Sequence, residues 1–220
     1  MIAIIDYGMG NLRSVEKAFE KVGFKAVITD KFEIIEKAEK IVLPGVGAFE
    51  DAKEGLQKRD LIGPIIKHIK EGKFFLGICL GLHLLFSKSS EDGEHKGLDV
   101  IAGKVVKFDF GQLCVSSKRD KKEDSSGGNN HRLKIPHMGW NQVKIKKDIP
   151  VLKGLPDNSY MYFVHSYYVV PDHEDIIATE TEYGGPFVSM IAIDNVFAMQ
   201  FHPEKSQQHG LMILKNFGEL

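Results

Sequence analysis

Short apolar runs alternate with amphipathic stretches through the first half of the chain. Ile2 to Ile5 form the first run, and apolar residues at helical spacing follow from Leu12 to Val22, with Gly23 as the stop. The same pattern predicts further strands at 26–28, 40–43 and 74–78, and a helix at 62–70. Strands that are apolar without alternation are typical of a parallel sheet covered on both faces by helices. The pattern therefore predicts an α/β fold with an open, mostly parallel sheet.

Beyond Gly103 the pattern changes to strands separated by turns, and helical spacing returns only at 210–217. The strands expected here are 104–108, 141–145, 160–164, 176–182, 188–193 and 196–200. Because no linker separates the two halves, we expect a single domain over 1–220. The strand-rich half is then an antiparallel or mixed extension of the same sheet.

One segment, 111–130, interrupts this second half. A run of charges there passes into Ser, Gly and Asn without apolar periodicity. This composition predicts an exposed, flexible insertion around 111–131. A regulatory or partner-binding role is conceivable, but most such loops have none.

Charge and cysteine content exclude several classes of protein. The 220 residues include 29 Lys and Arg against 30 Asp and Glu, a formal net charge of -1, so nothing favours a nucleic-acid partner. Two cysteines, Cys79 and Cys114, give no disulfide framework and favour a reducing compartment. The longest nearly uninterrupted apolar run, 74–86, is shorter than the ~20 residues that span a bilayer. With no basic leader at the amino terminus, we expect a cytoplasmic protein without a membrane partner.

The most informative motif is Gly77-Ile-Cys79-Leu-Gly81, between an apolar strand and an expected apolar helix. This is the nucleophile-elbow pattern with cysteine in the serine position, where the two glycines leave room for a strained turn. A helix amino terminus beside Cys79 would favour thiolate over thiol. The alternative is that Cys79 is a small buried residue, as free cysteines often are. A catalytic base is needed to decide.

The candidate base is His202, which lies two residues before Glu204 and follows an apolar strand. In an extended backbone the two side chains lie on the same side, and Pro203 stiffens the link. Glu204 would orient the imidazole, and His202 would take the thiol proton and return it to a leaving amine. Alone, His-Pro-Glu is more often an accidental turn. Together with the elbow it gives a Cys79, His202 and Glu204 triad hypothesis.

A third segment, Pro44-Gly-Val46-Gly47, ends a strand before an expected helix. The backbone N–H groups of such a loop can point at a developing oxyanion, with Leu80 N–H as a second donor. A plain turn between strand and helix is the alternative.

These three segments, in this order, resemble the class I glutamine amidotransferase family, which implies a flavodoxin-like fold. More narrowly, the chain is similar to the glutaminase subunits of imidazole glycerol phosphate synthases, over nearly its whole length outside 111–130. The matching segments are DYGMGNLRS at 6–14, PGVG at 44–47, PHMGWN at 136–141, FVHSY at 163–167, EYGG at 182–185 and QFHPEKS at 200–206.

The resemblance implies that L-glutamine is hydrolysed to glutamate and ammonia without a metal or organic cofactor. The ammonia would pass to a (β/α)8-barrel cyclase subunit, the partner in a heterodimer of cytosolic histidine biosynthesis. The implied oxyanion donors are Val46, Gly47 and Leu80. The implied substrate contacts are Gly47, His83, Glu91, His165, Ser166 and Tyr167, and the implied partner contacts are Asn11, Trp140, Tyr162 and Lys205.

Three features add to these expectations. His83 stands where relatives usually have glutamine, and because an imidazole offers one donor and one acceptor in a fixed ring, we expect glutamine binding with a pH dependence near neutrality. A lone tryptophan such as Trp140 is more often a core residue, a preference that the resemblance reverses. The 44–47 backbone would take its donor orientation only in the complex, so the isolated chain is expected to be nearly silent.

Other functions stay open at this point. A paralogous glutaminase could feed a different synthase, such as one that modifies surface sugars, and a non-catalytic scaffolding subunit is disfavoured by the intact triad residues. A peptidase with a cysteine elbow would share the fold, but the placement of His-Pro-Glu favours the amidotransferase. Dinucleotide binding through Gly8-Met-Gly10 lacks the third glycine of that fingerprint.

Overall fold

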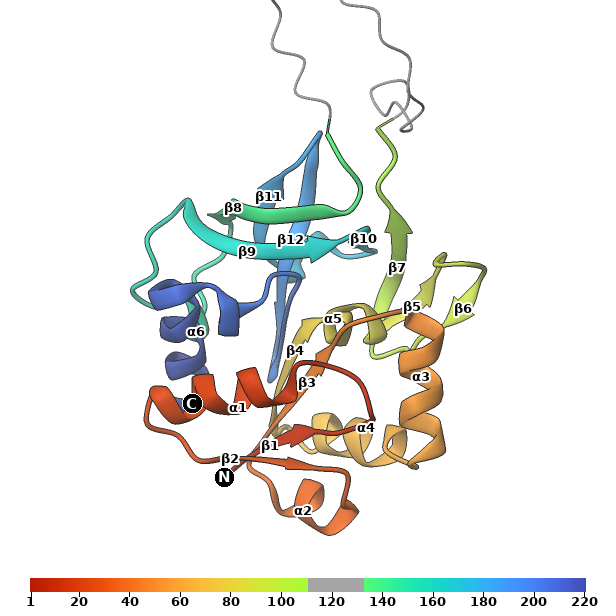
Figure 1. The fold of residues 1–220 in the computed structure, drawn as a ribbon, viewed down its shortest axis with the longest axis vertical. Coiled ribbons are helices and arrows are strands. Elements are labelled where there is room, and N and C mark those ends of the chain that lie inside the picture. Colours follow the sequence, from red (N-terminus) through yellow and green to blue (C-terminus); the bar gives the residue numbers. More distant parts are fainter. Residues whose placement is uncertain (111–132) are drawn as a thin grey trace, which may run out of the picture.

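The computed structural model describes residues 1–110 and 133–220 (Figure 1). The expected flexible insertion around 111–131, together with Cys114, lies outside the described residues.

Most helices and strands of the first half of the chain lie where the hydrophobic pattern predicts them, whereas the helix at 32–37 and the strands at 86–89 and 95–96 were not predicted. In order, the elements are β1 Ile2–Ile5, α1 Leu12–Lys21, β2 Ala26–Thr29, α2 Phe32–Lys37, β3 Lys40–Gly45, α3 Phe49–Lys58, α4 Ile62–Lys70, β4 Phe74–Cys79, α5 Leu80–Leu84, β5 Phe86–Ser89, β6 His95–Lys96 and β7 Ile101–Lys107.

The second half is rich in strands and ends in a helix. Its strands and helices are β8 His137–Ile145, β9 Ser159–His165, β10 Tyr167–Pro171, β11 Ile177–Glu182, β12 Pro186–Ile193, β13 Val196–Met199 and α6 Gln207–Glu219. Short 3₁₀ turns are η2 Pro150–Leu152, η3 Glu174–Ile176 and η4 Pro203–Lys205.

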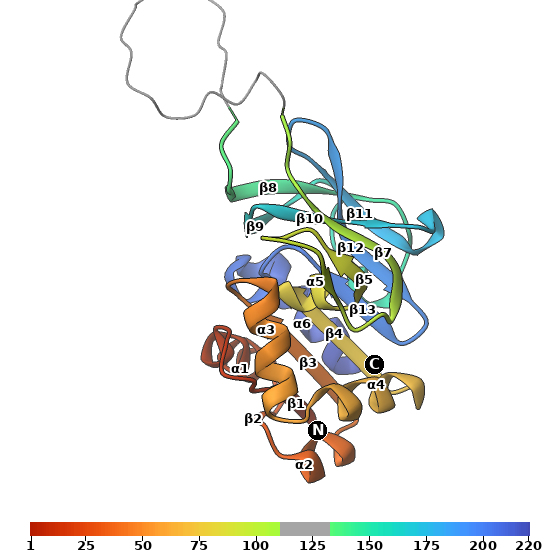
Figure 2. The ribbon, with the colours of Figure 1, turned by 90° about the vertical axis from the view of Figure 1, so that its right-hand side faces the viewer.

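A sheet runs through both halves of the chain. Its parallel part has the order β2-β1-β3-β4-β13, which is the flavodoxin-like order. From β13 the sheet continues through the antiparallel strands β12, β10 and β7, while β11, β8 and β9 branch from β12. Figure 2 shows β8 and β9 above the helix-covered parallel strands. The predicted α/β class and the mixed extension in the second half are confirmed.

Both faces of the parallel strands are buried, which explains why their sequences do not alternate. Ile2 and Ile4 belong to one core cluster with residues of α1 and α6, whereas Ala3 and Ile5 belong to the other with residues of α2, α3 and α4. In Figure 1, α1 and α6 lie on one side of the sheet and α3 and α4 on the other. Every residue of β1 therefore meets apolar atoms.

The helix expected after Cys79 is shorter than its apolar sequence suggests. It ends at Leu84, and the chain continues as β5. Backbone N–H groups of Leu98 and Val100 donate to the carbonyls of Leu84 and Leu85 at 2.8 and 2.9 Å, so these carbonyls are bound by a distant segment. Apolar periodicity alone cannot distinguish a buried helix from a buried strand in so short a run. The expected apolar helix after Cys79 is α5, and the end of the apolar run 74–86 begins β5.

The turn at Cys79 has the strained backbone of a nucleophile elbow. Cys79 has φ 54° and ψ −108°, a positive φ that is rare for residues other than glycine. A Cβ on Gly81 would lie 1.9 Å from the carbonyl oxygen of Leu43, and one on Gly77 would lie 2.9 Å from the Cβ of Ala198. Both glycines of the motif are therefore required by close contacts.

Among the described residues, no helix combines the length and the apolar character that crossing a bilayer requires.

We expect Gly81→Ala to lower the free energy of unfolding by about 3 kcal/mol or more, because its Cβ would overlap the backbone of β3. Gly63→Ala is the matched control, since Gly63 also lies in a helix but has open space at its Cβ, and it should cost no stability. Urea denaturation measures both. Equal losses in the two variants would contradict the steric argument.

Candidate active site

Three strand ends place the predicted chemical groups side by side. In the register of the parallel strands, Gly45 at the end of β3 lies opposite Cys79 at the end of β4, and Ile78 lies opposite Met199 at the end of β13. The glycine-rich loop, the elbow and the segment leading to His202 therefore start from neighbouring strands. Ligands of open α/β sheets bind at this carboxyl edge.

His202 and Glu204 form a buried pair. The Nδ1 atom of His202 lies 2.9 Å from Oε1 of Glu204, and the two side chains are 3% and 1% exposed. Burial lowers the pKa of His202, but Cys79 and Glu204 favour the charged ring more strongly and raise that pKa to about 10. Because Nδ1 faces Glu204, Nε2 is the ring atom left to exchange a proton with Cys79. The predicted triad residues are thus brought together.

The backbone around His202 is tied to β9. The N–H of His202 donates to the carbonyl of Tyr162 at 2.9 Å, and the hydroxyl of Ser206 donates to the carbonyl of His202 at 2.6 Å. The same hydroxyl accepts the N–H of Tyr162 at 3.0 Å. Ser206 therefore joins the segment that carries His202 to β9. Sequence reasoning missed this role because the partner strand is distant in the chain.

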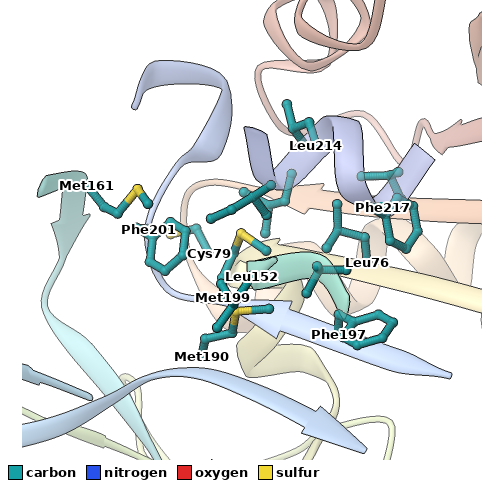
Figure 3. Close-up of a cluster of buried hydrophobic side chains, with 14 of the residues drawn as sticks. Leu76, Cys79, Leu152, Met161, Met190, Phe197, Met199, Phe201, Leu214 and Phe217 are labelled. Atoms are coloured by element: carbon teal, nitrogen blue, oxygen red, sulfur yellow. The ribbon is translucent and has the colours of Figure 1, made fainter. Parts of the chain in front are cut away.

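Cys79 lies at the border between the core and a cavity. It belongs to the buried apolar cluster drawn in Figure 3. Its thiol lies 3.9 Å from the carbonyl of Val164, and the amide Nε2 of Gln200 donates to Sγ at 3.8 Å. The alternative of an inert buried cysteine does not explain a side chain that also lines the cavity.

The cavity beside Cys79 has a volume of about 380 Å³ and collects every residue that the resemblance implied for substrate and oxyanion. Its lining consists of Val46, Gly47, Cys79, Leu80, His83, Glu91, Pro136, Val164, His165, Ser166 and Tyr167. Pro136 and Val164 were not predicted. His202 and Glu204 are absent from the lining. A small molecule in the cavity would therefore lie next to Cys79.

Glu91 brings a carboxylate to this cavity. Burial raises its pKa, an effect that the N–H of Phe49, donating to Oε2 at 3.2 Å, partly opposes. The carboxylate could bind a cationic group of a ligand.

The glycine-rich loop approaches the elbow closely. Gly47 has φ 96°, a conformation that glycine adopts without strain. A Cβ on Gly45 would lie 2.5 Å from the hydroxyl of Tyr7 and 2.8 Å from the Cβ of Leu80. Burial, and to a smaller extent the charge of Cys79, raise the pKa of Tyr7. Tyr7 was not predicted, and it packs the loop against the first residue of α5.

His83 is oriented by a second buried amide. Its Nε2 atom lies 2.7 Å from Oε1 of Gln200, the same amide that donates to Cys79. Complete burial lowers the pKa of His83 to about 4 and outweighs the opposite effect of Gln200. The ring is neutral at physiological pH. The expectation of a titration near neutrality at this position is therefore corrected.

Three of the four residues implied as partner contacts lie together. The rings of Trp140 and Tyr162 are 6.0 Å apart in an edge-on arrangement, and the Nζ of Lys205 lies 5.6 Å from the centre of the Tyr162 ring. Trp140 is 46% exposed, so it is not a core residue. Met138 and Tyr160 are 62% and 54% exposed on the same two strands. The period-two spacing of Met138 and Trp140 could have revealed this face.

Asn11, the remaining implied contact, is exposed directly before α1. Across residues 1–110 and 133–220, no three His, Cys, Asp or Glu side chains gather in a way that could hold a metal ion.

Comparison with known proteins agrees with this geometry. The family model for class-I glutamine amidotransferases matches residues 3–219. The chain belongs to this family. A class-I amidotransferase assignment accounts for the elbow, the buried His202 and Glu204 pair, and the glycine-rich loop at one sheet edge.

Relatives that match this class-I amidotransferase over its full length have a more specific name than the family. The imidazole glycerol phosphate synthase subunit HisH of Syntrophotalea carbinolica is 50% identical over 220 residues, which cover 100% of both chains. The HisH subunit of Geobacter sulfurreducens is 52% identical over 219 residues, covering 100% of this chain and 98% of the relative. The solved structure of PurLQS from Thermotoga maritima shares the fold, with a TM-score of 0.69, 14% identity and coverage of 98% and 96%.

In this amidotransferase, we expect Glu204→Gln to lower the pKa of His202 from about 10, because the carboxylate that favours the charged ring is removed. Titration of ¹⁵N-labelled histidine rings by NMR measures the shift. Glu50→Gln is the matched control, since Glu50 lies beside His95 at 3.6 Å, and it should leave His202 unchanged. A wild-type His202 that titrates at the ordinary value of about 6.5 would contradict the charged pair.

The same spectra test His83. We expect its ring to remain neutral down to a pKa of about 4 because it is fully buried, and His83→Gln assigns its signal by removing it. A His83 signal that changes near neutrality would contradict the low pKa and support the expectation that glutamine binding depends on pH near neutrality.

Proposed function

We propose that this chain is the glutaminase subunit of an imidazole glycerol phosphate synthase, which supplies ammonia for histidine biosynthesis. The observation that carries the proposal is the full-length identity of about 50% to HisH subunits, in a chain whose Cys79, His202 and Glu204 meet beside a cavity. The substrate is L-glutamine, and the products are glutamate and ammonia.

The chemistry follows from the positions of the three groups. Cys79 Sγ attacks the side-chain amide carbon of glutamine, and the carbonyl oxygen takes up the negative charge. His202, held through Nδ1 by Glu204, gives its Nε2 proton to the departing nitrogen, which leaves as ammonia. A water then gives a proton to His202 and a hydroxyl to the glutamyl thioester, which releases glutamate and restores the thiolate. This cycle consumes only glutamine and water.

The transient oxyanion needs hydrogen-bond donors. The N–H groups of Val46 and Gly47 in the loop after β3, and of Leu80 at the start of α5, are the candidates. Glycines on both sides of Val46 make rotation of its peptide groups sterically cheap. Partner binding could therefore switch the loop into its donor orientation.

Glutamine would be held by residues of the same cavity. The carboxylate of Glu91 suits the α-ammonium group, and the backbone from His165 to Tyr167 lines the opposite wall. His83 contributes a neutral ring, fixed by Gln200, so we infer no change in glutamine affinity near neutral pH from this residue.

The partner that we propose is a (β/α)8-barrel cyclase subunit, bound as a heterodimer on the exposed face of Trp140, Tyr162 and Lys205. Aromatic residues and a cation clustered on a surface are typical of protein interfaces. Asn11 is the fourth contact that we infer. We further infer one domain over 1–220 and a cytoplasmic location, on the continuous sheet and the biosynthetic relatives.

The function is tested with purified chain, with and without a cyclase subunit and its acceptor substrate. Cys79→Ala should lower glutamate release by at least about a thousandfold, because the nucleophile is lost. The complex should hydrolyse glutamine much faster than the chain alone. Ammonium chloride should restore the acceptor reaction of the Cys79→Ala complex, which controls for intact assembly.

Two results would contradict the proposal. Equal glutamate release by Cys79→Ala and wild type would remove the nucleophile assignment. Failure of every cyclase complex to use the ammonia, with the glutaminase active, would favour a glutaminase that serves another synthase.

A further inference from the structure

Two buried histidines in the strand-rich half have no role in the chemistry above. His137 at the start of β8 and His165 at the end of β9 lie opposite one another in the antiparallel register. Both side chains are almost fully buried. They belong to the segments 136–141 and 163–167, whose side-chain pattern the glutaminase reaction leaves unexplained.

A continuous chain of hydrogen bonds passes through both rings. The Nδ2 atom of Asn141 lies 3.2 Å from Nε2 of His137, and Nδ1 of His137 lies 2.9 Å from Nε2 of His165. Nδ1 of His165 lies 2.8 Å from the backbone carbonyl oxygen of Tyr167. The chain therefore joins an amide on β8 to the first residue of β10.

The partners at the two ends fix the direction of every bond. The Tyr167 carbonyl can only accept, so His165 carries its proton on Nδ1, and its Nε2 accepts from Nδ1 of His137. Nε2 of His137 must then accept from the Asn141 amide. The oxygen and nitrogen of that amide cannot exchange places, because Oδ1 accepts the N–H of Gln142 at 2.8 Å and Nδ2 donates to the backbone carbonyl of Glu182 at 2.9 Å.

The surroundings keep both rings uncharged. Burial lowers the pKa of His137 to about 4 and that of His165 well below its ordinary value. The rings that pack against the pair are those of Phe108, Phe163, Tyr183 and Phe187. The titratable groups facing His165 are His137, His83 and His202, and a positive charge on any of them lowers its pKa further.

The geometry points to a positioning role: the chain Asn141, His137, His165 fixes the carbonyl of Tyr167 and with it the turn at Ser166 that lines the glutamine cavity. The N–H of Phe108 holds the carbonyl of Ser166 at 3.1 Å from the other side. With both carbonyls bound, the turn between β9 and β10 presents one backbone surface to the cavity. This inference rests on the proposed function, because it takes glutamine as the occupant.

The first test needs no turnover. NMR of ¹⁵N-labelled histidine rings in the full chain should show His137 and His165 as neutral rings protonated at Nδ1, throughout the physiological pH range. The variants His137→Gln and His165→Gln assign the signals. A proton on Nε2 of either ring in the wild type would overturn the directed chain.

The second test reverses one end of the chain. In Asn141→Asp the carboxylate can only accept, so Nε2 of His137 must become a donor. At low pH His137 can carry both protons and still donate to His165. At higher pH His137 keeps only the Nε2 proton, so its Nδ1 must accept a hydrogen bond from Nε2 of His165. Nδ1 of His165 then carries no proton, and its bond to the carbonyl of Tyr167 is lost. The KM for glutamine, relative to wild type, should therefore rise roughly tenfold as the pH increases, with kcat changing much less.

The matched control is Asn216→Asp. The Nδ2 of Asn216 also donates to backbone carbonyls, those of Val151 and Lys153, at 3.1 and 2.9 Å, and the two bonds to Asn216 that the structure shows involve no histidine. It should add no pH dependence to KM. A KM for Asn141→Asp that follows the control at every pH would overturn the positioning role. Absence of glutaminase activity in the wild-type complex, with both rings protonated at Nδ1, would count against the proposed function while supporting the directed chain.

Discussion

The strained backbone at Cys79 is the constraint on which the geometry of the active site depends. A positive φ at the end of a buried strand turns the chain within one residue and lifts the sulfur to the sheet edge. That turn is possible only because Gly81 packs directly against the carbonyl of Leu43 and Gly77 against Ala198. The strain is held by contacts with β3 and β13, the strands that carry the other chemical groups. The sheet thus fixes the nucleophile and its neighbours together.

Four buried histidines lie near this edge of the sheet, yet only His202 is charged. His83, His137 and His165 face amides, a carbonyl or each other, so burial favours their neutral forms. His202 is equally buried but faces the carboxylate of Glu204 and the sulfur of Cys79, and these favour its cation. The partner of each ring, rather than its depth, therefore decides its charge. The neutral rings also avoid placing positive charge near the imidazolium.

The sequence predicts the strands of the parallel half, though not α2, and proposes the triad residues, because both depend on local patterns. Apolar runs mark β1 to β4, and glycine spacing marks the elbow at Cys79. The pattern does not show which strands are neighbours in the sheet. Strand β13 lies beside β4 and so brings His202 to Cys79, and this pairing could not be predicted from the pattern. Strand β10 and the early end of α5 escape prediction because long-range backbone bonds, such as that from Leu98 to Leu84, determine them.

Side-chain roles are least predictable where the partner comes from another strand. Gln200 and Asn141 both lie in segments that carry the family resemblance, 200–206 and 136–141, but the sequence does not show which histidine each amide orients. An amide suits this task because it donates and accepts at fixed positions and cannot take up a proton at physiological pH. It can therefore set the tautomer of a buried ring without adding a charge.

Strand β9 links the exposed aromatic face to the chemistry. Along its length, the partly buried ring of Tyr162 contacts Trp140 and Lys205 while its backbone binds His202 and Ser206, and Val164 offers its carbonyl to the thiol of Cys79. His165 then ends the strand in the directed chain. Because the backbone of Tyr162 is bonded to both His202 and Ser206, we expect a displacement of Tyr162 to move His202 with it. A partner that docks on this face would therefore act on the base and the nucleophile through backbone hydrogen bonds rather than through a separate relay.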